Sequence, residues 1–278
     1  MRTITQTADA GAASGLAFYA CPACKQPLLQ QPDALRCGAC SQTFPIRQGT
    51  PEFISEELSQ SQYPVLRRMT AIDHMARIYE TKLWYPIVLA VYGGLRSASL
   101  PQLISTVSRN IAPAEGRVLD VACGPGTYGR RIASPSKEVF GIDVSRGMLR
   151  QGAAYAAREG IANIHFARAR VEALPFEREF FDGVLCCGSL HLFADTVIAL
   201  REMARVMKPA AILSVFTFTA GEAGILKYRR VREWGCKNGL HVFELSEMER
   251  YLDAAGFERF EPEVFGSILT FSARRKAA

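Results

Sequence analysis

Two cysteine pairs near the N-terminus have the spacing of a metal site. "CPAC" runs from Cys21 to Cys24, and "CGAC" runs from Cys37 to Cys40. Each Cys-x-x-Cys turn places two thiolates on one side of the chain, and two such turns can form a tetrahedral sulfur cage. A redox dithiol is the alternative, but that motif is expected alone beside a βαβ unit, not duplicated in a short segment. The spacing therefore predicts a zinc ion, which is structural because sulfur fills every coordination position.

A glycine-rich stretch, "RVLDVACGPGTYGRRIA" over residues 117–133, is the second candidate for chemistry. Gly124 and Gly126 would let a ligand approach the main chain, and the helix that follows offers free N–H groups. Asp143 ends the next expected strand 23 residues after Asp120. An acid at that place can accept both hydroxyls of a ribose. The combination fits a nicotinamide dinucleotide or S-adenosylmethionine.

An alternation of strands and helices must position these residues. Eight elements are expected, in chain order over residues 117–122, 127–134, 138–143, 145–160, 163–169, 180–187, 196–207 and 210–218. Ser145 should cap the long helix and Gly160 should end it. The alternation predicts an α/β fold, a parallel sheet with helices on both faces, whose ligands bind at the carboxyl ends of the strands.

The spacing of the glycine turn favours one ligand class. From Ala122 the residues are A-C-G-P-G-T, which lacks the G-x-G-x-x-G of dinucleotide folds. The turn instead resembles motif I of the class I S-adenosylmethionine-dependent methyltransferases, of the type 11 or UbiE-like group. Later stretches resemble this family in order: "GIDVSRGMLRQ", "ALPFEREFFDGVLCCGSLHLF", "RVMKPAAIL" and "LDAAGFERFEPEVFG…ILTFSARRK". The resemblance implies a Rossmann-like, seven-stranded methyltransferase sheet.

The N-terminal segment has a resemblance of its own. "TFPIRQGTPEFI" resembles the close of small zinc ribbons such as the activator subunit of tRNA methyltransferases. The whole chain also resembles uncharacterised bacterial and plastid methyltransferases with an N-terminal zinc ribbon. The expected organisation is a flexible tail over 1–17, a zinc ribbon over 18–57, a helical lid over 58–112 and the methyltransferase domain over 113–278.

The methyltransferase resemblance implies roles for the matching residues. Asp120 and the backbone around Gly124 and Gly126 would receive the amino-acid end of S-adenosylmethionine, and Asp143 would hold the ribose hydroxyls. Met148 would pack on the adenine and Cys187 would lie near the methionine portion, although simple core packing explains both equally well. The remaining expected contacts are Tyr79, Ala122, Val144, Val171 and Glu172.

Three departures from the family pattern affect these expectations. Ala122 replaces the first glycine of motif I, and Ala210 with Ala211 replaces a Gly-Gly pair before the fifth strand. Arg170 stands where relatives usually have an acid that accepts a hydrogen bond from the adenine amino group. Arginine has only donors, so the adenine would rely on the Val171 backbone and on Glu172.

Residues outside the motifs bear on the acceptor. His191 follows the fourth strand and is the candidate general base, although a histidine there can also pack or shape the substrate. "YETKLWYPIVLAVYGGL" suits an apolar or aromatic small molecule, or a helix buried against the sheet. Four basic residues could meet an anionic group or form a solvated helix face: Lys227, Arg229, Arg230 and Arg232.

Composition narrows the function classes. The net charge of +6 is spread thinly, and residues 1–57 carry a net −1 (four Lys and Arg against five Asp and Glu). The longest apolar run, 83–95, is too short to span a bilayer, and no secretory signal is evident, so the expected compartment is the cytoplasm. A small-molecule methyltransferase is favoured. An rRNA guanine methyltransferase that uses the ribbon to recognise RNA is the alternative, and a non-catalytic interaction module with a degenerate cofactor site is the third. The oligomeric state stays open.

Overall fold

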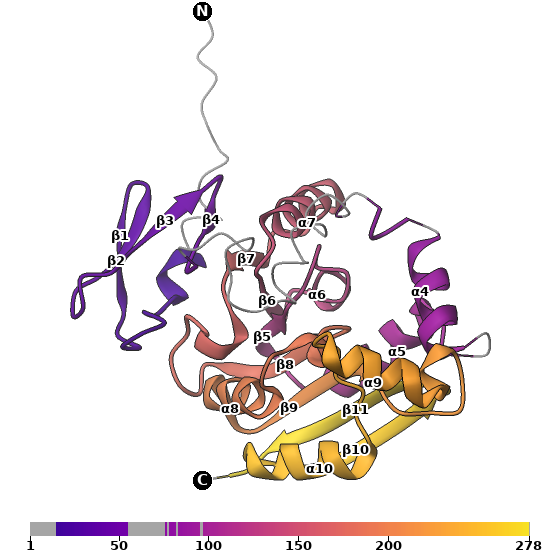
Figure 1. The fold of residues 1–278 in the computed structure, drawn as a ribbon. Helices are drawn as coiled ribbons and strands as arrows, with labels where there is room; N and C mark the ends of the chain where they lie inside the picture. Colours follow the sequence, from indigo (N-terminus) through magenta and orange to yellow (C-terminus); the bar gives the residue numbers. More distant parts are fainter. Residues whose placement is uncertain (1–14, 55–75, 77, 82, 95–96, 278) are drawn as a thin grey trace, which may run out of the picture.

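A small N-terminal sheet lies beside a larger α/β unit in the computed structural model of the chain (Figure 1). The structure describes residues 15–54, 76, 78–81, 83–94 and 97–277. The expected tail up to residue 14 and the part of the expected lid at 58–75 lie outside the described residues.

The larger sheet has seven strands in the order β10-β11-β9-β8-β5-β6-β7. Its strands are β5 (Gly116–Val121), β6 (Lys137–Asp143), β7 (Ile164–Arg168), β8 (Phe181–Cys187), β9 (Met207–Phe218), β10 (Phe257–Phe265) and β11 (Ile268–Arg275). Strands β7, β6, β5, β8 and β9 follow one another across the sheet and pair in parallel. Strand β11 runs antiparallel to β9, and β10 runs antiparallel to β11. The predicted seven-stranded Rossmann-like sheet is confirmed.

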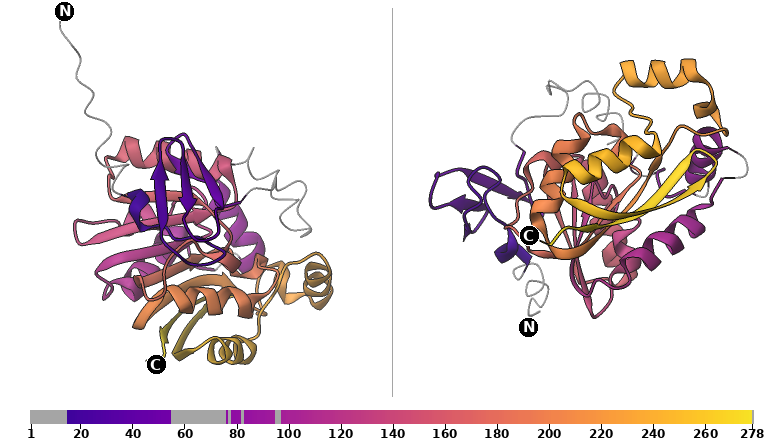
Figure 2. Two further views of the ribbon diagram at one scale, coloured as in Figure 1. Left: turned by 90° about the vertical axis from the view of Figure 1, so that its left-hand side faces the viewer. Right: turned by 90° about the horizontal axis from the view of Figure 1, so that it is seen from below.

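Helices cover both faces of this sheet (Figure 2). One hydrophobic cluster holds side chains of α8 (Thr196–Val206) and α10 (Leu245–Ala254). The other holds side chains of α4 (Trp84–Gly93), α5 (Leu100–Ile111), α6 (Gly129–Ile132) and α7 (Arg146–Glu159). Helix α5 buries Leu103, Val107 and Ile111 against β8, β9 and β11, so this part of the expected lid belongs to the helical layer of the sheet.

Local sequence signals explain where the helices begin and end. Ser145 caps α7, with its Oγ accepting the N–H of Met148 at 3.0 Å, and Gly160 ends α7 at a φ of 71°, both as predicted. Helix α6 is shorter than expected because Ser134 precedes a proline, which disfavours helical backbone there. Met207, expected at the end of α8, begins β9 instead.

The N-terminal ribbon is a four-stranded antiparallel sheet with β1 (Leu28–Gln31), β2 (Ala34–Cys37), β3 (Thr43–Arg47) and β4 (Thr50–Pro51). Its aromatic side chains face the larger sheet. Tyr19 contacts Phe176 at a ring-centroid distance of 5.3 Å, and Phe18 contacts Phe140 at 5.6 Å. Ribbon and domain therefore share one hydrophobic cluster.

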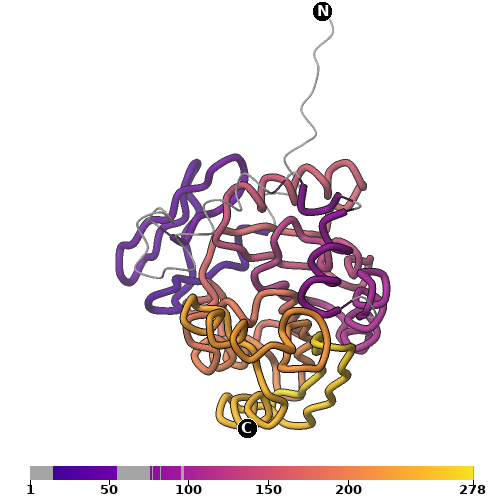
Figure 3. Tube along the Cα trace, turned by 45° about the vertical axis from the view of Figure 1, so that its right-hand side comes forward, coloured from indigo at the N-terminus to yellow at the C-terminus, as the bar shows by residue number. Residues whose placement is uncertain are grey.

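Main-chain hydrogen bonds extend this packing at the β7 edge of the sheet. The Phe53 N–H donates to the Arg168 carbonyl at 2.8 Å, and the Ala20 N–H donates to the Pro175 carbonyl at 2.8 Å. The ribbon thus pairs with the C-terminal end of β7, while the β10–β11 hairpin forms the opposite edge of the sheet (Figure 3).

The residues just before the ribbon are packed against the domain. Gly15 is buried, and a Cβ there would lie 2.4 Å from Nδ1 of His165. The 3₁₀ helix η1 (Leu16–Phe18) follows at once. Residues 15–17, expected to belong to a flexible tail, thus stand at the start of a short helix whose Leu16 packs against the hydrophobic core.

Candidate functional site

One carboxylate joins two loops at the carboxyl end of the sheet. Asp143 ends β6, and its Oδ2 accepts the N–H of Gly124 at 2.9 Å while its Oδ1 accepts the N–H of Ser145 at 2.8 Å. The glycine turn after β5 and the loop after β6 are therefore fixed relative to each other. A carboxylate has about four acceptor positions, so both oxygens keep capacity for further donors.

Asp120, at the end of β5, lies beneath the same turn. Its side chain is buried, and Oδ2 accepts the N–H of Gly129 at 2.9 Å. Burial raises the pKa of Asp120 to about 7; the Gly129 N–H opposes this shift, and the nearby Asp143 charge adds to it. The two predicted acids thus have different environments although they lie on neighbouring strands.

The glycine turn has the backbone that the motif requires. Gly124 and Gly126 have φ values of 55° and 73°, in the left-handed region. Among the residues that the structure describes, a Cβ on Gly124 would have only the Tyr79 ring nearby, 3.9 Å away, so these residues leave space beside Gly124. Ala122 has a φ of 52°, which costs a residue with a Cβ roughly 1–2 kcal/mol. The alanine at this motif position is therefore strained as well as small.

Two tyrosines and a cysteine surround this space. Burial, followed by the Asp143 charge, raises the pKa of Tyr79 to about 12. Burial also raises the pKa of Tyr128 well above its usual range, with smaller contributions from Cys187, Tyr79 and Asp120. The Tyr128 hydroxyl is buried and has no hydrogen-bond partner in the part of the chain that the structure describes. It is a polar group available to a ligand.

Two side-chain networks hold these loops in place, one around Glu80 and one around Glu52. The sequence analysis predicted neither of them. Glu80 accepts hydrogen bonds from Thr127 Oγ1 and Arg130, each at 2.5 Å, and so ties the segment before α4 to α6. Thr127 belongs to the glycine turn but Glu80 lies 47 residues before it and outside every motif, so only the contact in the fold reveals the pairing.

The second side-chain network connects the ribbon to the loop after β6. Glu52 is 4% exposed and accepts two hydrogen bonds from Arg146, at 2.7 and 2.8 Å. Arg168, at the end of β7, donates to the carbonyls of Val144 at 3.0 Å and Ile54 at 2.9 Å. A charged residue inside the apolar stretch "IHFARA" was the one available signal. The ribbon thus holds the residues on either side of Ser145.

The structure brings several predicted cofactor residues together and leaves others apart. Asp120, Asp143, the turn glycines and Tyr79 converge. Met148 is buried on α7, Val171 is buried in the hydrophobic cluster that the ribbon shares, and Cys187 is half-buried at the end of β8. Glu172 is exposed and lines a groove with Ile198 of α8, so its side chain does not reach the Asp143 loop.

His191 does not have the environment of a general base. It is 5% exposed in the 3₁₀ helix η4 (Leu190–Leu192), with Nδ1 3.3 Å from Thr217 Oγ1 and its ring against Phe218. Burial, followed by His241, lowers the pKa of His191 to about 3. A base that weak is a poor proton acceptor at neutral pH, so the structure does not support the expected catalytic role.

The four ribbon cysteines form one cluster. Their Sγ atoms all lie within 4.8 Å of one another, with Cys21 and Cys40 3.5 Å apart and Cys24 and Cys37 3.4 Å apart. Zinc–sulfur bonds of about 2.3 Å give a tetrahedron with edges of roughly 3.8 Å, so the donor set fits zinc. The residue after each knuckle, Lys25 or Ser41, has a φ of 60°, which shows that the two knuckles have matching backbones.

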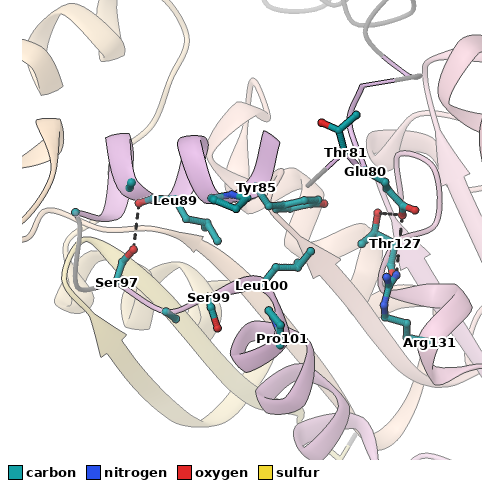
Figure 4. Close-up of a pocket in the computed structure, with 14 residues that line it drawn as sticks. Glu80, Thr81, Tyr85, Leu89, Ser97, Ser99, Leu100, Pro101, Thr127 and Arg131 are labelled. Carbon is teal, nitrogen blue, oxygen red and sulfur yellow. Dashed lines mark hydrogen bonds and ion pairs between the residues drawn. The ribbon is translucent and has the colours of Figure 1, made fainter. Parts of the chain in front are cut away.

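A cavity of about 400 Å³ lies between α4, α5 and α6 (Figure 4). Tyr85, Leu89 and Leu100 form much of its apolar wall, and Glu80 and Thr127 lie at its polar end. Thr127 follows the glycine turn directly, so the cavity adjoins the candidate cofactor site.

Comparison with known families agrees with this geometry. A family model described as "Methyltransferase domain" matches residues 118–210, and one described as "Trm112p-like protein" matches residues 16–49. Together with the observed fold and the cysteine cluster, these matches show a methyltransferase domain that follows a Trm112p-like N-terminal segment. The family resemblance seen in the sequence is confirmed.

Individual relatives match different parts of the chain. The uncharacterized methyltransferase YcgJ of Bacillus subtilis is 35% identical over 95 residues, which is 34% of this chain and 38% of that protein. The ubiquinone/menaquinone biosynthesis C-methyltransferase UbiE of Pasteurella multocida is 37% identical over 107 residues, 37% of this chain and 40% of that protein. The chain thus spans about two fifths of the length of these relatives.

Two further similarities extend beyond the central motifs. The chloroplastic uncharacterized methyltransferase At2g41040 of Arabidopsis thaliana is 24% identical over 92% of this chain and 78% of that protein. Phosphoethanolamine N-methyltransferase 2 of Haemonchus contortus, solved with S-adenosyl-L-methionine, has a TM-score of 0.58 at 17% identity over 74% of this chain and 60% of that one. The latter supports the fold alone.

The raised pKa of Asp120 predicts a pH dependence of stability. Between the unfolded value near 4 and the folded value of about 7, the folded chain binds more protons at this group, so its contribution to the unfolding free energy falls as pH rises. Asp120→Asn removes this slope. Urea unfolding at pH 5 and pH 7.5, without cofactor, should show Asp120→Asn gaining stability relative to wild type at the higher pH. Parallel profiles would contradict the assignment, and Asp253→Asn, at an exposed site, is the control.

Proposed function

We propose that this protein is an S-adenosylmethionine-dependent methyltransferase that acts on an apolar or aromatic small molecule. The observation that carries the proposal is the Asp143 carboxylate, which fixes the Gly124 turn and the Ser145 loop around open space at the carboxyl ends of β5 and β6. In open α/β sheets, ligands bind at this place.

The residues present fit the cofactor. Asp143 would accept the ribose hydroxyls, and the raised pKa of Asp120 marks a carboxyl that gains most from a cationic neighbour such as the amino group of the methionine portion. Within the described residues, the Tyr128 hydroxyl has no hydrogen-bond partner and one side of Gly124 is open, so they would add a polar contact and room for close approach. Arg170 caps the 3₁₀ helix η3 (Val171–Ala173), and adenine contacts from the Val171 backbone stay a prediction.

The bound cofactor would supply a methyl group already activated by a positively charged sulfur. The protein's part is then orientation and exclusion of water rather than strong acid–base chemistry. Tyr79 and Tyr85 lie in edge contact at a centroid distance of 5.6 Å, between the Gly124 turn and the cavity. Because burial leaves His191 only weakly basic, a reaction that needs no strong base fits this site best.

The cavity supports the acceptor class. Tyr85, Leu89 and Leu100 give it an apolar wall that would bind apolar or aromatic groups, and its other lining residues include charged and hydroxyl side chains. RNA recognition by the ribbon has less support, because its aromatic residues in the described range turn inward: Phe18, Tyr19, Phe44 and Phe53 pack on one another or on the domain. Few aromatics are left to stack on bases.

Structural zinc belongs to the same proposal. All four donors are sulfur, which leaves no open coordination position for substrate. Zinc would stabilise the ribbon, and through the shared hydrophobic cluster it would also stabilise the edge of the domain.

Calorimetric titration with S-adenosylmethionine and S-adenosylhomocysteine tests the proposed function. We expect dissociation constants on the order of micromolar for the wild type. Asp143→Ala should weaken binding at least about a hundredfold, because two or more charge-assisted hydrogen bonds are lost. Asp253→Ala, at an exposed carboxylate on α10, should bind as the wild type does. Absence of binding by the wild type at millimolar cofactor would favour the non-catalytic interaction module.

Metal analysis and thermal melting test the zinc assignment. Purified chain should carry about one zinc ion, and removal by a chelator should lower the melting temperature of the whole chain. Cys40→Ser should lose the metal, whereas Cys236→Ser, at the other exposed cysteine on α9 (Arg229–Lys237), should retain it. Metal-free wild type with an unchanged melting temperature would overturn the assignment.

A further inference from the structure

Helix α4 carries an apolar row that the described part of the protein does not cover. Its residues, Trp84–Gly93, include no charged side chain. Leu83, Ile87 and Val91 are 70%, 57% and 41% exposed and recur at intervals of four residues, so they form one row along the helix. A helix that is apolar on all sides is normally buried in a core or in a membrane. Here its outer side faces solvent.

The row continues onto the start of α9 through a shallow apolar groove. Val91 and Ala90 of α4 line this groove together with Ile225, Lys227 and Tyr228. In the view from below, α4 and α9 lie at the same corner of the molecule (Figure 2). Tyr228 is 55% exposed, and Lys227 Nζ lies 4.9 Å from the centre of its ring.

Helix α9 adds a second exposed aromatic residue with basic neighbours. Trp234 is 66% exposed, and Arg230 and Lys237 lie four residues before and three residues after it, on the same helix face. Residues 221–242 hold five Lys and Arg against two Asp and Glu, a net +3. One of the two acids, Glu233, pairs with Arg229 at 3.3 Å. The charge of this corner is therefore positive.

We propose that this corner, formed by Leu83, Ile87, Val91, Tyr228 and Trp234 with Arg230 and Lys237, docks the protein on the surface of an anionic lipid membrane. Exposed aliphatic residues enter the headgroup boundary, Tyr and Trp rings sit at that depth, and basic side chains meet anionic headgroups. None of the helices in the described residues is both long and apolar enough to cross a membrane.

The docking surface borders the cavity. Ala90 and Gly94 line both the surface groove and the cavity between α4 and α5. An apolar acceptor dissolved in the membrane would therefore lie one helix away from its proposed binding place. This last step rests on the proposed function, whereas membrane docking itself needs neither cofactor nor acceptor.

Vesicle flotation of the full, zinc-loaded chain tests the proposal. The probes are phosphatidylcholine vesicles with and without about 30% phosphatidylglycerol. The wild type should float with the anionic vesicles and remain behind with the neutral ones, and binding should weaken as salt increases.

Variants of the docking-surface residues, each with a matched control elsewhere, test whether vesicle binding depends on this surface. Ile87→Asn combined with Val91→Asn should weaken binding at least tenfold, and its control is Leu29→Asn combined with Ile198→Asn, at exposed sites elsewhere. Arg230→Gln combined with Lys237→Gln should weaken vesicle binding about fivefold per charge removed. Its control is Arg36→Gln combined with Arg178→Gln, at exposed sites elsewhere. All substituted side chains are exposed, so melting temperatures should change little.

Three results would overturn the proposal. The first is a wild type that binds no vesicles or binds neutral ones equally well. The second is a set of variants that bind like their controls. The third is a wild type that light scattering shows to be a dimer and that Ile87→Asn with Val91→Asn converts to a monomer, since the surface would then join two copies. Cofactor titration is done without vesicles, so failure of docking and failure of the proposed function are distinguishable.

Discussion

The Asp143 carboxylate is the contact on which the candidate site depends. It receives main-chain N–H groups from two loops that leave neighbouring parallel strands, and so links the Gly124 turn directly to the Ser145 loop. Backbone donors near a helix start are costly to leave unpaired when buried, so this acid has a structural task as well as its proposed contact with the ribose. The same side chain thus shapes the site and completes it.

The ribbon takes part in this arrangement rather than hanging from the domain. It pairs with the C-terminal end of β7 through main-chain hydrogen bonds, shares a hydrophobic cluster with the sheet, and places Glu52 against Arg146, the residue after the Ser145 cap. Breaking a buried ion pair by removing one partner typically costs about 3–5 kcal/mol. The ribbon therefore supports the loop after β6, where the cofactor is proposed to bind. It does so even though its four cysteines leave no metal coordination position for a substrate.

What the sequence predicts well is what local chemistry decides. The strands follow from apolar runs, α7 from its Ser145 cap and Gly160 stop, and the cysteine cluster from two Cys-x-x-Cys turns. The remaining features depend on which distant segments meet. Glu52 and Arg146 are unremarkable until the ribbon packs on the sheet, His191 loses its basicity because Thr217 and Phe218 enclose it, and Glu172 misses the site because η3 turns its side chain toward α8. The roles of the convergent residues stay predictions.

The central claim is that the ribbon and the loop after β6, where the cofactor is proposed to bind, form one structural unit. The affinity of Glu52→Gln for S-adenosylhomocysteine tests this claim most directly. Calorimetry below the melting temperature of the variant should show binding at least about tenfold weaker than in the wild type, because Arg146 and Arg168 lose their charged partner and the Asp143 loop loses its support. Glu177→Gln, at an exposed site, should bind normally. Equal affinity of Glu52→Gln and wild type for S-adenosylhomocysteine would contradict the claim. The ribbon would then lie beside the site without supporting it.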